Sequence, residues 1–292
     1  MRTVLAIAAL LLAQGCALRQ LAVDRFADAV ASTGAAYAMD DDPELVRAAA
    51  PFGLKLTESL LGEAPHHKGL LLAGARGFTQ YAYAFVQQEA DELEERDVAA
   101  AGALQDRARR LYRRAREYGL RGLGLTVEQL RIEPRKALAA IPRSEAGLLY
   151  WTGAAWAASI GLSKSDPESV AELPAVEALV DRALELDEAY ERGAIHTFLV
   201  GYEMVRQGAP GDPAERARRH FARAVELSGK GDAAPYVALA EAVCVPAQRR
   251  AEFGSLLGAA LAVDAPENRL ANLVMQRRAR WLLARSDRLF LD

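Results

Sequence analysis

The feature that most constrains this chain is an uncharged stretch at its centre, from Ala146 to Ser163. It lies between Glu145 and Lys164 and holds two of the three tryptophans, Trp151 and Trp156. A helix that is apolar on every side either crosses a membrane or is enclosed by other protein elements. The choice between these two alternatives decides the architecture.

Small residues within the stretch favour the second alternative. Three glycines and five alanines lie between residues 146 and 163, and they suit close contact with neighbouring helices better than exposure to lipid. We therefore interpret the stretch as a buried helix, with one side available as the wall of an internal channel.

The rest of the composition is that of an ordinary globular protein. The chain has 292 residues, enough to bury a sizeable core, and 51% of them are hydrophobic and 26% charged. The net charge of -3 argues against a protein that binds nucleic acid and against a polybasic membrane-surface protein. No low-complexity linker divides the chain, so we predict a single domain over residues 16–292.

The N-terminus has the pattern of an export signal. Arg2 supplies positive charge, and residues 4–13 form an apolar run too short to span a bilayer comfortably. The run leads into Leu-Ala-Gln-Gly-Cys at Leu12–Cys16, which resembles a lipobox, the motif that precedes a lipidated cysteine. We predict that residues 1–15 are a signal peptide cleaved before Cys16, and that Cys16 is lipidated. The alternative is an ordinary secretory signal with an incidental cysteine.

These features predict a periplasmic protein that is held at a membrane by its N-terminal lipid. An aspartate after the lipidated cysteine often directs retention at the inner membrane. The residue here is Ala17, which favours the outer membrane. Cys244 is the only other cysteine, so no intrachain disulfide is expected, and Cys244 is interpreted as a small core residue.

The mature part of the chain predicts an all-α fold. Alanine and leucine dominate, and no clear alternating strand pattern occurs. Asp42, Asp166 and Asp212 each precede a proline, which places a capping side chain before a proline at the first helical position. Pro51 lies inside the helical pattern of residues 43–61, where a kink or break is expected.

A short phrase recurs along the predicted helices, with residues at i, i+4 and i+7 and alanine as the last member. The final alanines are separated by 68, 41 and 36 residues, and the first step is twice the tetratricopeptide period of about 34 residues. We predict tetratricopeptide-like helical hairpins stacked into a compact α-solenoid, because two helices alone cannot bury their apolar faces. The alternative is chance spacing in alanine-rich helices. The copies are Ala108, Tyr112 and Ala115; Val176, Val180 and Ala183; Ala217, Phe221 and Ala224; and Phe253, Leu257 and Ala260.

Partner helices are expected in the intervals between these phrases. They are predicted over residues 68–93, 146–163, 188–207, 236–244 and 267–285. Glycines at 119–124, 208–211 and 229–231 are interpreted as loops.

No catalytic constellation is present in the sequence. The chain lacks a glycine-rich phosphate loop, a Gly-x-Ser-x-Gly motif, a His-Glu-x-x-His helix and a Cys-x-x-Cys pair. We therefore predict a protein that is not an enzyme, with no catalytic residues, no metal site and no cofactor. Seven arginines in residues 107–121 are interpreted as a solvated or partner-docking helix face, with RNA binding as the weaker alternative.

The remaining candidates for ligand contact are mostly aromatic. Trp151 and Trp156 are five positions apart, so on one helix they project at ~140° to each other. These side chains either belong to the core or line an apolar ligand cavity, which favours aromatic walls. The candidate ligand- or channel-lining residues are Tyr81, Phe85, Tyr150, Trp151, Trp156, His196 and Tyr202.

Five segments in order resemble the T-component family of tripartite ATP-independent periplasmic (TRAP) transporters, the TatT-like lipoproteins. They begin at Asp40, Gly69, Leu148, Leu173 and Glu267, with sequences such as GLLLAGARGFTQYAYAFVQQEADEL and LLYWTGAAWAASI. They are helix-packing phrases that cover most of the mature chain, and their joint order makes the resemblance specific.

The resemblance implies a non-enzymatic subunit of a solute uptake system. It implies tetratricopeptide-like hairpins, a homotrimer with a pore through each subunit, and association with a periplasmic solute-binding protein. It implies no catalytic residue, and the ligands it suggests are apolar compounds or organic acids. A general envelope scaffold lipoprotein with no transport role is the alternative function.

Overall fold

The computed structural model describes residues 25–30 and 37–291, and within these ranges the chain is helical and contains no strand. The predicted all-α class is confirmed. The predicted signal peptide and Cys16 lie outside the described residues.

The helices follow one another with short connections. π-helical turns η1 (Tyr83–Gln87) and η4 (Ala240–Cys244) continue α4 and α14, and η1 joins α4 to α5 in one rod. The helices are α3 (Pro43–Glu63), α4 (Lys68–Ala82), α5 (Gln88–Leu93), α6 (Val98–Leu123), α7 (Val127–Ile132), α8 (Pro134–Leu138), α9 (Ala146–Gly161), α10 (Pro167–Val170), α11 (Leu173–Leu186), α12 (Ala194–Tyr202), α13 (Pro213–Leu227), α14 (Ala234–Leu239), α15 (Arg250–Leu261), α16 (Arg269–Leu283) and α17 (Ser286–Leu289).

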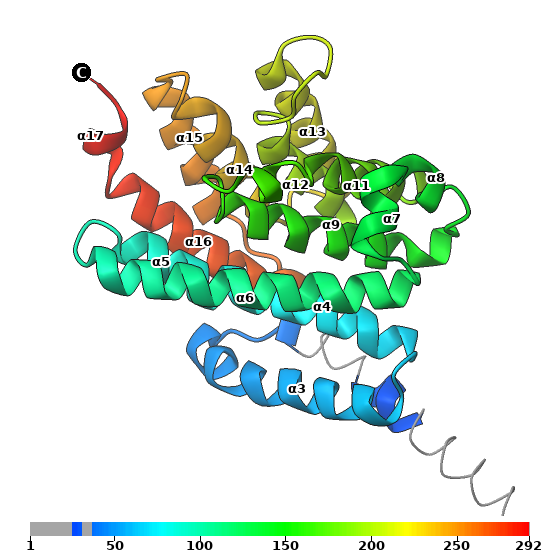
Figure 1. Cartoon of the computed structure of the whole chain (residues 1–292). Coiled ribbons are helices and arrows are strands. Elements are labelled where there is room, and N and C mark those ends of the chain that lie inside the picture. The colour runs from blue at the N-terminus through cyan, green and yellow to red at the C-terminus, as the bar shows by residue number, and fades with distance from the viewer. Residues whose placement is uncertain (1–24, 31–36, 292) are drawn as a thin grey trace, which may run out of the picture.

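Neighbouring helices in the sequence pack against each other in space (Figure 1). α3 covers α4 at one edge, α4 packs on α6, α6 on α9, and α9 on α11. α12 packs on α13, α14 on α15, and α15 on α16. α16 then reaches back to the N-terminal layer, where Arg277 pairs with Glu92 and Arg278 pairs with Asp91, both at 2.8 Å.

The recurring phrase marks the buried faces of α6, α11, α13 and α15. Its small and apolar members are buried, and only Phe221 is half-buried. The spacing i, i+4, i+7 follows one side of an α-helix, so the three members of a copy lie on one side of their helix.

α9 is the most enclosed helix of the described chain. Thirteen of its 16 residues are buried, which agrees with the interpretation of the central stretch. Within the described ranges, no helix combines the length and hydropathy that a membrane span requires.

The aspartate caps are confirmed. Asp42 accepts from the backbone N–H groups of Glu44 and Leu45, and Asp166 and Asp212 cap α10 and α13 in the same way. α3 continues through Pro51, so the chain does not break there. A proline removes only one backbone donor, and α3 packs on α4 on both sides of Pro51, through Val46 before it and Leu61 after it.

The glycines of residues 119–124 do not form a loop, contrary to the prediction. α6 runs to Leu123, and only Gly124 leaves the helix, with a left-handed φ of 67°. A Cβ on Gly119 would overlap the Thr152 hydroxyl oxygen. The glycine therefore permits the close crossing of α6 and α9.

Candidate functional site

The two tryptophans of α9 point to different neighbours. The Trp156 indole N–H donates to Glu172 Oε2 at 2.8 Å, and the Arg116 guanidinium carbon lies 4.8 Å from the ring centroid. The Trp151 indole N–H donates instead to the Tyr190 hydroxyl at 3.2 Å. Trp156 is thus held between α6 and the start of α11, whereas Trp151 faces the turn that leads into α12.

Trp151 belongs to a group of aromatic side chains that we call the α9–α12 aromatic cluster. Its members are Tyr150, Trp151, Tyr190, Phe198 and Tyr202. Tyr150 is central, with its ring centroid 4.8 Å from Trp151, 5.8 Å from Tyr190 and 6.3 Å from Phe198. Phe198 stacks on Tyr202 at 5.4 Å. Such pairs contribute about 0.5–1.5 kcal/mol each beyond the burial of their area.

The turn that delivers Tyr190 has an unusual backbone. Glu191, Arg192 and Gly193 have successive φ values of 43°, 60° and 93°, all in the left-handed region. A residue with a side chain there costs of order 1–3 kcal/mol. The helix predicted over residues 188–207 is therefore wrong at its start, and the α-helix begins only at Ala194.

Contacts with later parts of the chain hold this turn in place. Arg192 donates to the Ser228 carbonyl at 2.8 Å and to Glu267 Oε1 at 2.9 Å. A Cβ on Gly193 would lie 3.1 Å from the Leu227 Cβ, so the backbone is pressed against α13. The strain is stabilised by tertiary contacts, a pattern that occurs most often at functional positions.

The turn places the Glu191 carboxylate against the aromatic cluster. The Tyr190 hydroxyl donates to Glu191 Oε1 at 3.1 Å, and Arg76 Nη1 of α4 lies 3.0 Å from the same oxygen. Burial raises the pKa of Glu191, and the positive charge of Arg76 opposes that shift. The Arg76 guanidinium also lies 6.0 Å from the Trp151 ring centroid.

This arrangement places a charged pair at one edge of a packed group of aromatic rings. Burial raises the pKa of Tyr150 and Tyr190, so their hydroxyls stay protonated at neutral pH. A guanidinium binds carboxylates through paired hydrogen bonds, and aromatic rings enclose apolar groups. Arg76 is held here by Glu191, so an acidic solute would compete with that carboxylate for the guanidinium.

The sequence matches a known transporter family over most of its length. Residues 39–290 match the family described as TRAP transporter T-component. The chain belongs to this family. An uncharacterized protein of Treponema pallidum (strain Nichols) is 31% identical, in an alignment that covers 98% of this chain and 97% of the relative. T-components are envelope-associated parts of a transport system, not an enzyme family.

Two predicted residues of this T-component lie away from the aromatic cluster. Tyr81 and Phe85 contact each other at 5.7 Å in a separate core group with Val46 and Tyr112. The Arg107 guanidinium lies 5.9 Å from the Tyr81 ring centroid. The structure brings together Tyr150, Trp151 and Tyr202 from the predicted set, and leaves Trp156, Tyr81 and Phe85 at other contacts.

His196 lies on the face of α12 that packs against α13. Its Nδ1 is 2.8 Å from His220 Nδ1, and its Nε2 is 3.5 Å from Glu188 Oε2. Burial lowers the pKa of His196. Burial and the neighbouring His196 lower the pKa of His220 to about 4, so both rings are neutral at pH 7 and share one hydrogen bond.

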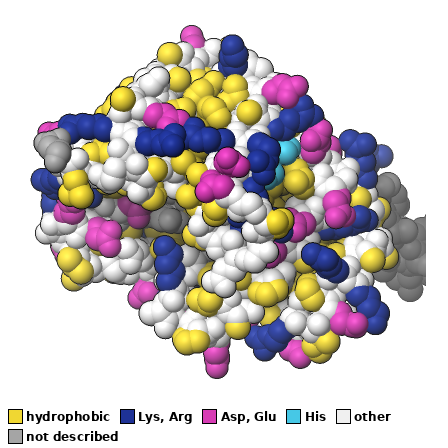
Figure 2. Space-filling model, turned by 90° about the horizontal axis from the view of Figure 1, so that it is seen from above, with side chains coloured by type: hydrophobic (Ala, Val, Ile, Leu, Met, Phe, Trp, Pro, Cys, Tyr) yellow, Lys and Arg dark blue, Asp and Glu magenta, His cyan; other side chains and the backbone are white. Residues whose placement is uncertain are grey.

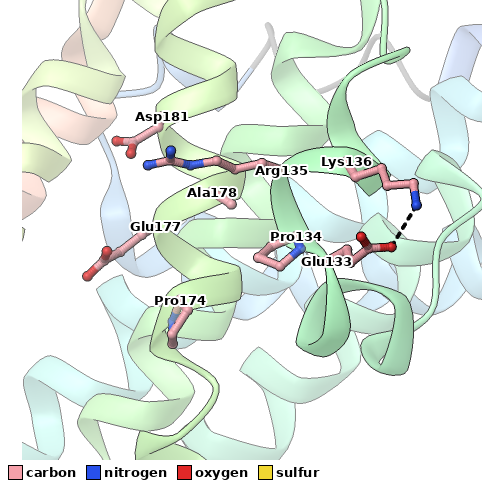
Figure 3. Close-up of a pocket in the computed structure, with 8 residues that line it drawn as sticks. All are labelled: Glu133, Pro134, Arg135, Lys136, Pro174, Glu177, Ala178 and Asp181. Carbon is pink, nitrogen blue, oxygen red and sulfur yellow. Dashed lines mark hydrogen bonds and ion pairs between the residues drawn. The ribbon is translucent and has the colours of Figure 1, made fainter.

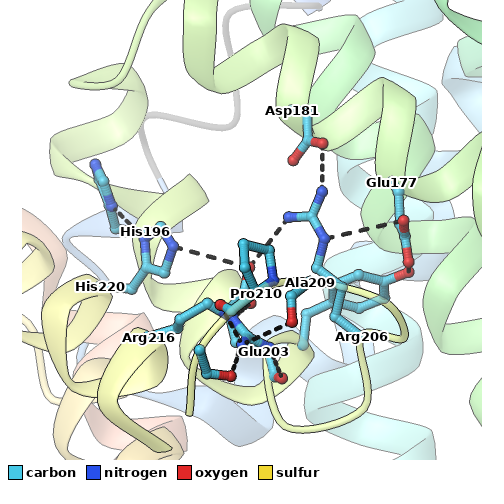
Figure 4. A network of polar contacts seen from close by, with 11 residues as sticks. Glu177, Asp181, His196, Glu203, Arg206, Ala209, Pro210, Arg216 and His220 are labelled. Atoms are coloured by element: carbon cyan, nitrogen blue, oxygen red, sulfur yellow. Dashed lines mark hydrogen bonds and ion pairs between the residues drawn. The ribbon is translucent and has the colours of Figure 1, made fainter. Parts of the chain in front are cut away.

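A charged network follows this histidine pair in the T-component (Figure 4). Arg216 donates to Glu203 Oε2 at 2.5 Å and to the carbonyls of residues 209–211. Arg206 joins Glu203 to Asp181 of α11. Burial raises the pKa of Glu203, but hydrogen bonds from the two arginines outweigh this and lower it overall. The network anchors the loop between α12 and α13.

Two open hollows lie along the polar side of α11. The first, of about 390 Å³, lies between α8 and α11, and Lys136 is bonded to Glu133 at its edge (Figure 3). The second, of about 590 Å³, is lined by residues 184–189 with Arg143 and His196. Of the predicted site residues, only His196 lines either hollow. In the part of the chain that the structure describes, no group of three His, Cys, Asp or Glu side chains is placed to hold a metal ion.

Sequence reasoning missed Arg76, Tyr190 and Glu191. Residues 188–207, which include Tyr190 and Glu191, were predicted as one continuous helix because their apolar residues keep helical spacing. Gly193 was the one local signal of this turn, because glycine adopts a left-handed backbone conformation readily. The pairing of Arg76 with Glu191 joins residues 115 positions apart (191 minus 76), and no local pattern reports it.

Proposed function

We propose that this chain is a lipid-anchored, non-enzymatic subunit of a TRAP-type uptake system that binds a periplasmic solute-binding protein. Membership of the T-component family supports the transport role. The proposal includes three parts that rest on the sequence. They are lipidation at Cys16, association with the solute-binding protein, and a location in the periplasm at the outer membrane.

The observation that carries a ligand-contacting role is the Glu191–Arg76 pair at the α9–α12 aromatic cluster. A strained turn there holds the half-buried Glu191 carboxylate beside the Arg76 guanidinium and the Tyr190 hydroxyl, at one edge of the aromatic cluster. We infer that the site receives the carboxylate and apolar body of an organic acid, with Arg76 as the anion partner and Trp151 and Tyr150 as walls.

We further propose that residues 16–292 form one domain of stacked tetratricopeptide-like hairpins with an internal channel, and that three copies associate. The burial of the recurring phrase on α6, α11, α13 and α15 supports the stacking. Figure 2 shows the face of the molecule that lies uppermost in Figure 1, and this face is hollowed. We propose that the mouth of the channel lies on this face.

Native mass spectrometry of the mature protein with the solute-binding protein of the same operon tests the partnership. We expect a complex at micromolar concentrations. The mass of the intact assembly should correspond to three copies of this chain. An absence of any complex across that range would favour the alternative of an envelope scaffold without a transport role.

The ligand site has a matched test within α9. Trp151→Phe and Arg76→Gln should lower the retention of an organic acid, followed as ligand mass on the native protein. Trp156→Phe, on the other side of the same helix, should leave retention unchanged. Equal retention in Arg76→Gln and wild type would exclude the proposed anion partner.

A further inference from the structure

α3 carries an apolar stripe on the side that faces away from the rest of the molecule. We call it the α3 outer stripe: Leu45, Ala48, Ala49, Phe52 and Leu56. The members recur at helical spacing, so they share one face. Phe52 is 75% exposed and Leu45 is 60% exposed, which is unusual for large apolar side chains gathered on one helix.

The stripe is not the packing face of α3. Val46, Thr57 and Leu61 lie on the opposite side of the helix and are buried. α3 forms the lower edge of the molecule in Figure 1, below α4 and α6. None of the described helices packs over the stripe, as the exposure of Leu45 and Phe52 requires.

The N-terminal tether ends on the same layer. Ala27, in the helical segment 25–30, is fully buried in a cluster with Leu61 of α3 and with Leu70 and Leu71 of α4. Phe26 and Met39 add exposed apolar side chains to this layer. Eight large hydrophobic side chains are exposed among the described residues, and four of them lie at or before residue 52: Phe26, Met39, Leu45 and Phe52.

The length of the tether limits where this layer can be. Nine residues lead from Cys16 to Arg25, and an extended chain spans at most about 3.6 Å per residue, or roughly 32 Å. A lipid on Cys16 would hold residues 25–30, and with them the α3–α4 layer, within that distance of the bilayer.

We propose that the α3 outer stripe rests on the lipid surface and orients the protein on its membrane. The inference depends on the lipid anchor in the proposed function. Phe52 and Leu45 would enter the headgroup region, as apolar faces of interfacial helices do. Lys55, three positions after Phe52 on the same helix and 69% exposed, would turn its ammonium group from Glu58 toward the headgroups.

This orientation has a consequence for the partner. α13 and α15 lie at the edge of the molecule opposite α3 (Figure 1). With α3 on the membrane, these helices face the periplasm, where a soluble solute-binding protein can reach them.

Spin labels on the lipidated mature protein test the proposal. The protein is reconstituted in vesicles of phosphatidylethanolamine and phosphatidylglycerol, with the label at Phe52→Cys or, as the matched control, at Ile132→Cys. Ile132 of α7 is also apolar and 67% exposed, but it lies outside the N-terminal layer. On binding to vesicles, we expect the label at position 52 to collide several-fold less often with a water-soluble nickel reagent than it does in solution. The collision rate of the label at position 132 should not change.

Three results would overturn the proposal. The label at 52 could remain as open to nickel as the label at 132 while the protein stays on the vesicles. Protection at 52 could arise without vesicles and grow with protein concentration, which would assign the stripe to contacts between copies. Protection could instead require the solute-binding protein, which would assign the stripe to that partner.

A second measurement separates the stripe from the anchor. A mature chain with Cys16→Ser has no lipid, and its weak partition onto the same vesicles should fall several-fold with Leu45→Gln and Phe52→Gln together. The control pair Ile132→Gln and Val205→Gln should leave partition unchanged. Equal partition in both pairs would overturn the proposal. Association with the solute-binding protein is measured separately in solution, so a failure of the membrane contact and a failure of the proposed partnership are distinguishable.

Discussion

α9 and α3 both carry more apolar surface than one packing face needs, yet they lie in opposite environments. α9 is surrounded by α4, α6 and α11, and its large side chains are enclosed. Among the described helices, α3 has neighbours on one side only, and Phe52 on its other side is exposed. The comparison teaches that an apolar side chain is enclosed only where neighbouring helices cover its side of the helix.

The largest test of this comparison removes a side chain from the enclosed helix. Trp156→Ala should lower the free energy of unfolding by about 3–5 kcal/mol, because a buried ring is lost and a cavity remains. Glu172 and Arg116 also lose their contacts with the indole. Urea unfolding measures the change, and a loss below about 1 kcal/mol would show that α9 is less tightly enclosed than described.

The second test asks whether enclosure extends to the polar contact of α12 with α13. In the unfolded chain His220 titrates near ~6.5, whereas its folded pKa is lowered to about 4. The unfolded state thus binds more protons between these values. The free energy of unfolding should be unaffected by this group above pH 6.5 and should fall by on the order of 3 kcal/mol as the pH decreases to about 4.

His220→Gln should flatten this part of the stability profile in urea titrations at several pH values. His66→Gln, at an exposed loop position, is the matched control and should keep the wild-type slope. Equal slopes in all three proteins would contradict the lowered pKa.

The third test changes the crossing that encloses α9. Gly119→Ala should destabilise the protein by about 1–3 kcal/mol, since the new methyl group overlaps Thr152 and α6 must shift. Gly102→Ala, in the same helix, meets nothing within 4 Å, and it should stabilise by about 0.5–1 kcal/mol through the helix propensity of alanine. Thermal unfolding of both variants checks the opposite signs.

The smallest effect is expected on the exposed side of α3. Phe52→Ala should change the free energy of unfolding by no more than about 0.5 kcal/mol, because its ring is in solvent in the isolated protein. A loss comparable with that of Trp156→Ala would mean that the stripe is covered, and the contrast between the two helices would fail.

Much of the fold is encoded locally. The Asp-Pro caps define helix starts within three or four residues, and the recurring phrase identifies one face of a helix from its own spacing. Both were predictable because the contacts that satisfy them lie nearby in the chain. The same reasoning proposed seven ligand-contacting candidates, of which the structure brings Tyr150, Trp151 and Tyr202 together; their role remains a proposal.

Other features depend on partners that local patterns do not contain. The sequence by itself determined an all-helical chain with an enclosed central helix, because charge and periodicity fix which surfaces avoid water. Only the tertiary structure decided that α6 continues through Gly119 and that the chain turns at Glu191 and Arg192. Both depend on distant contacts, with Thr152 in one case and with Ser228 and Glu267 in the other, that compensate locally unfavourable backbone choices.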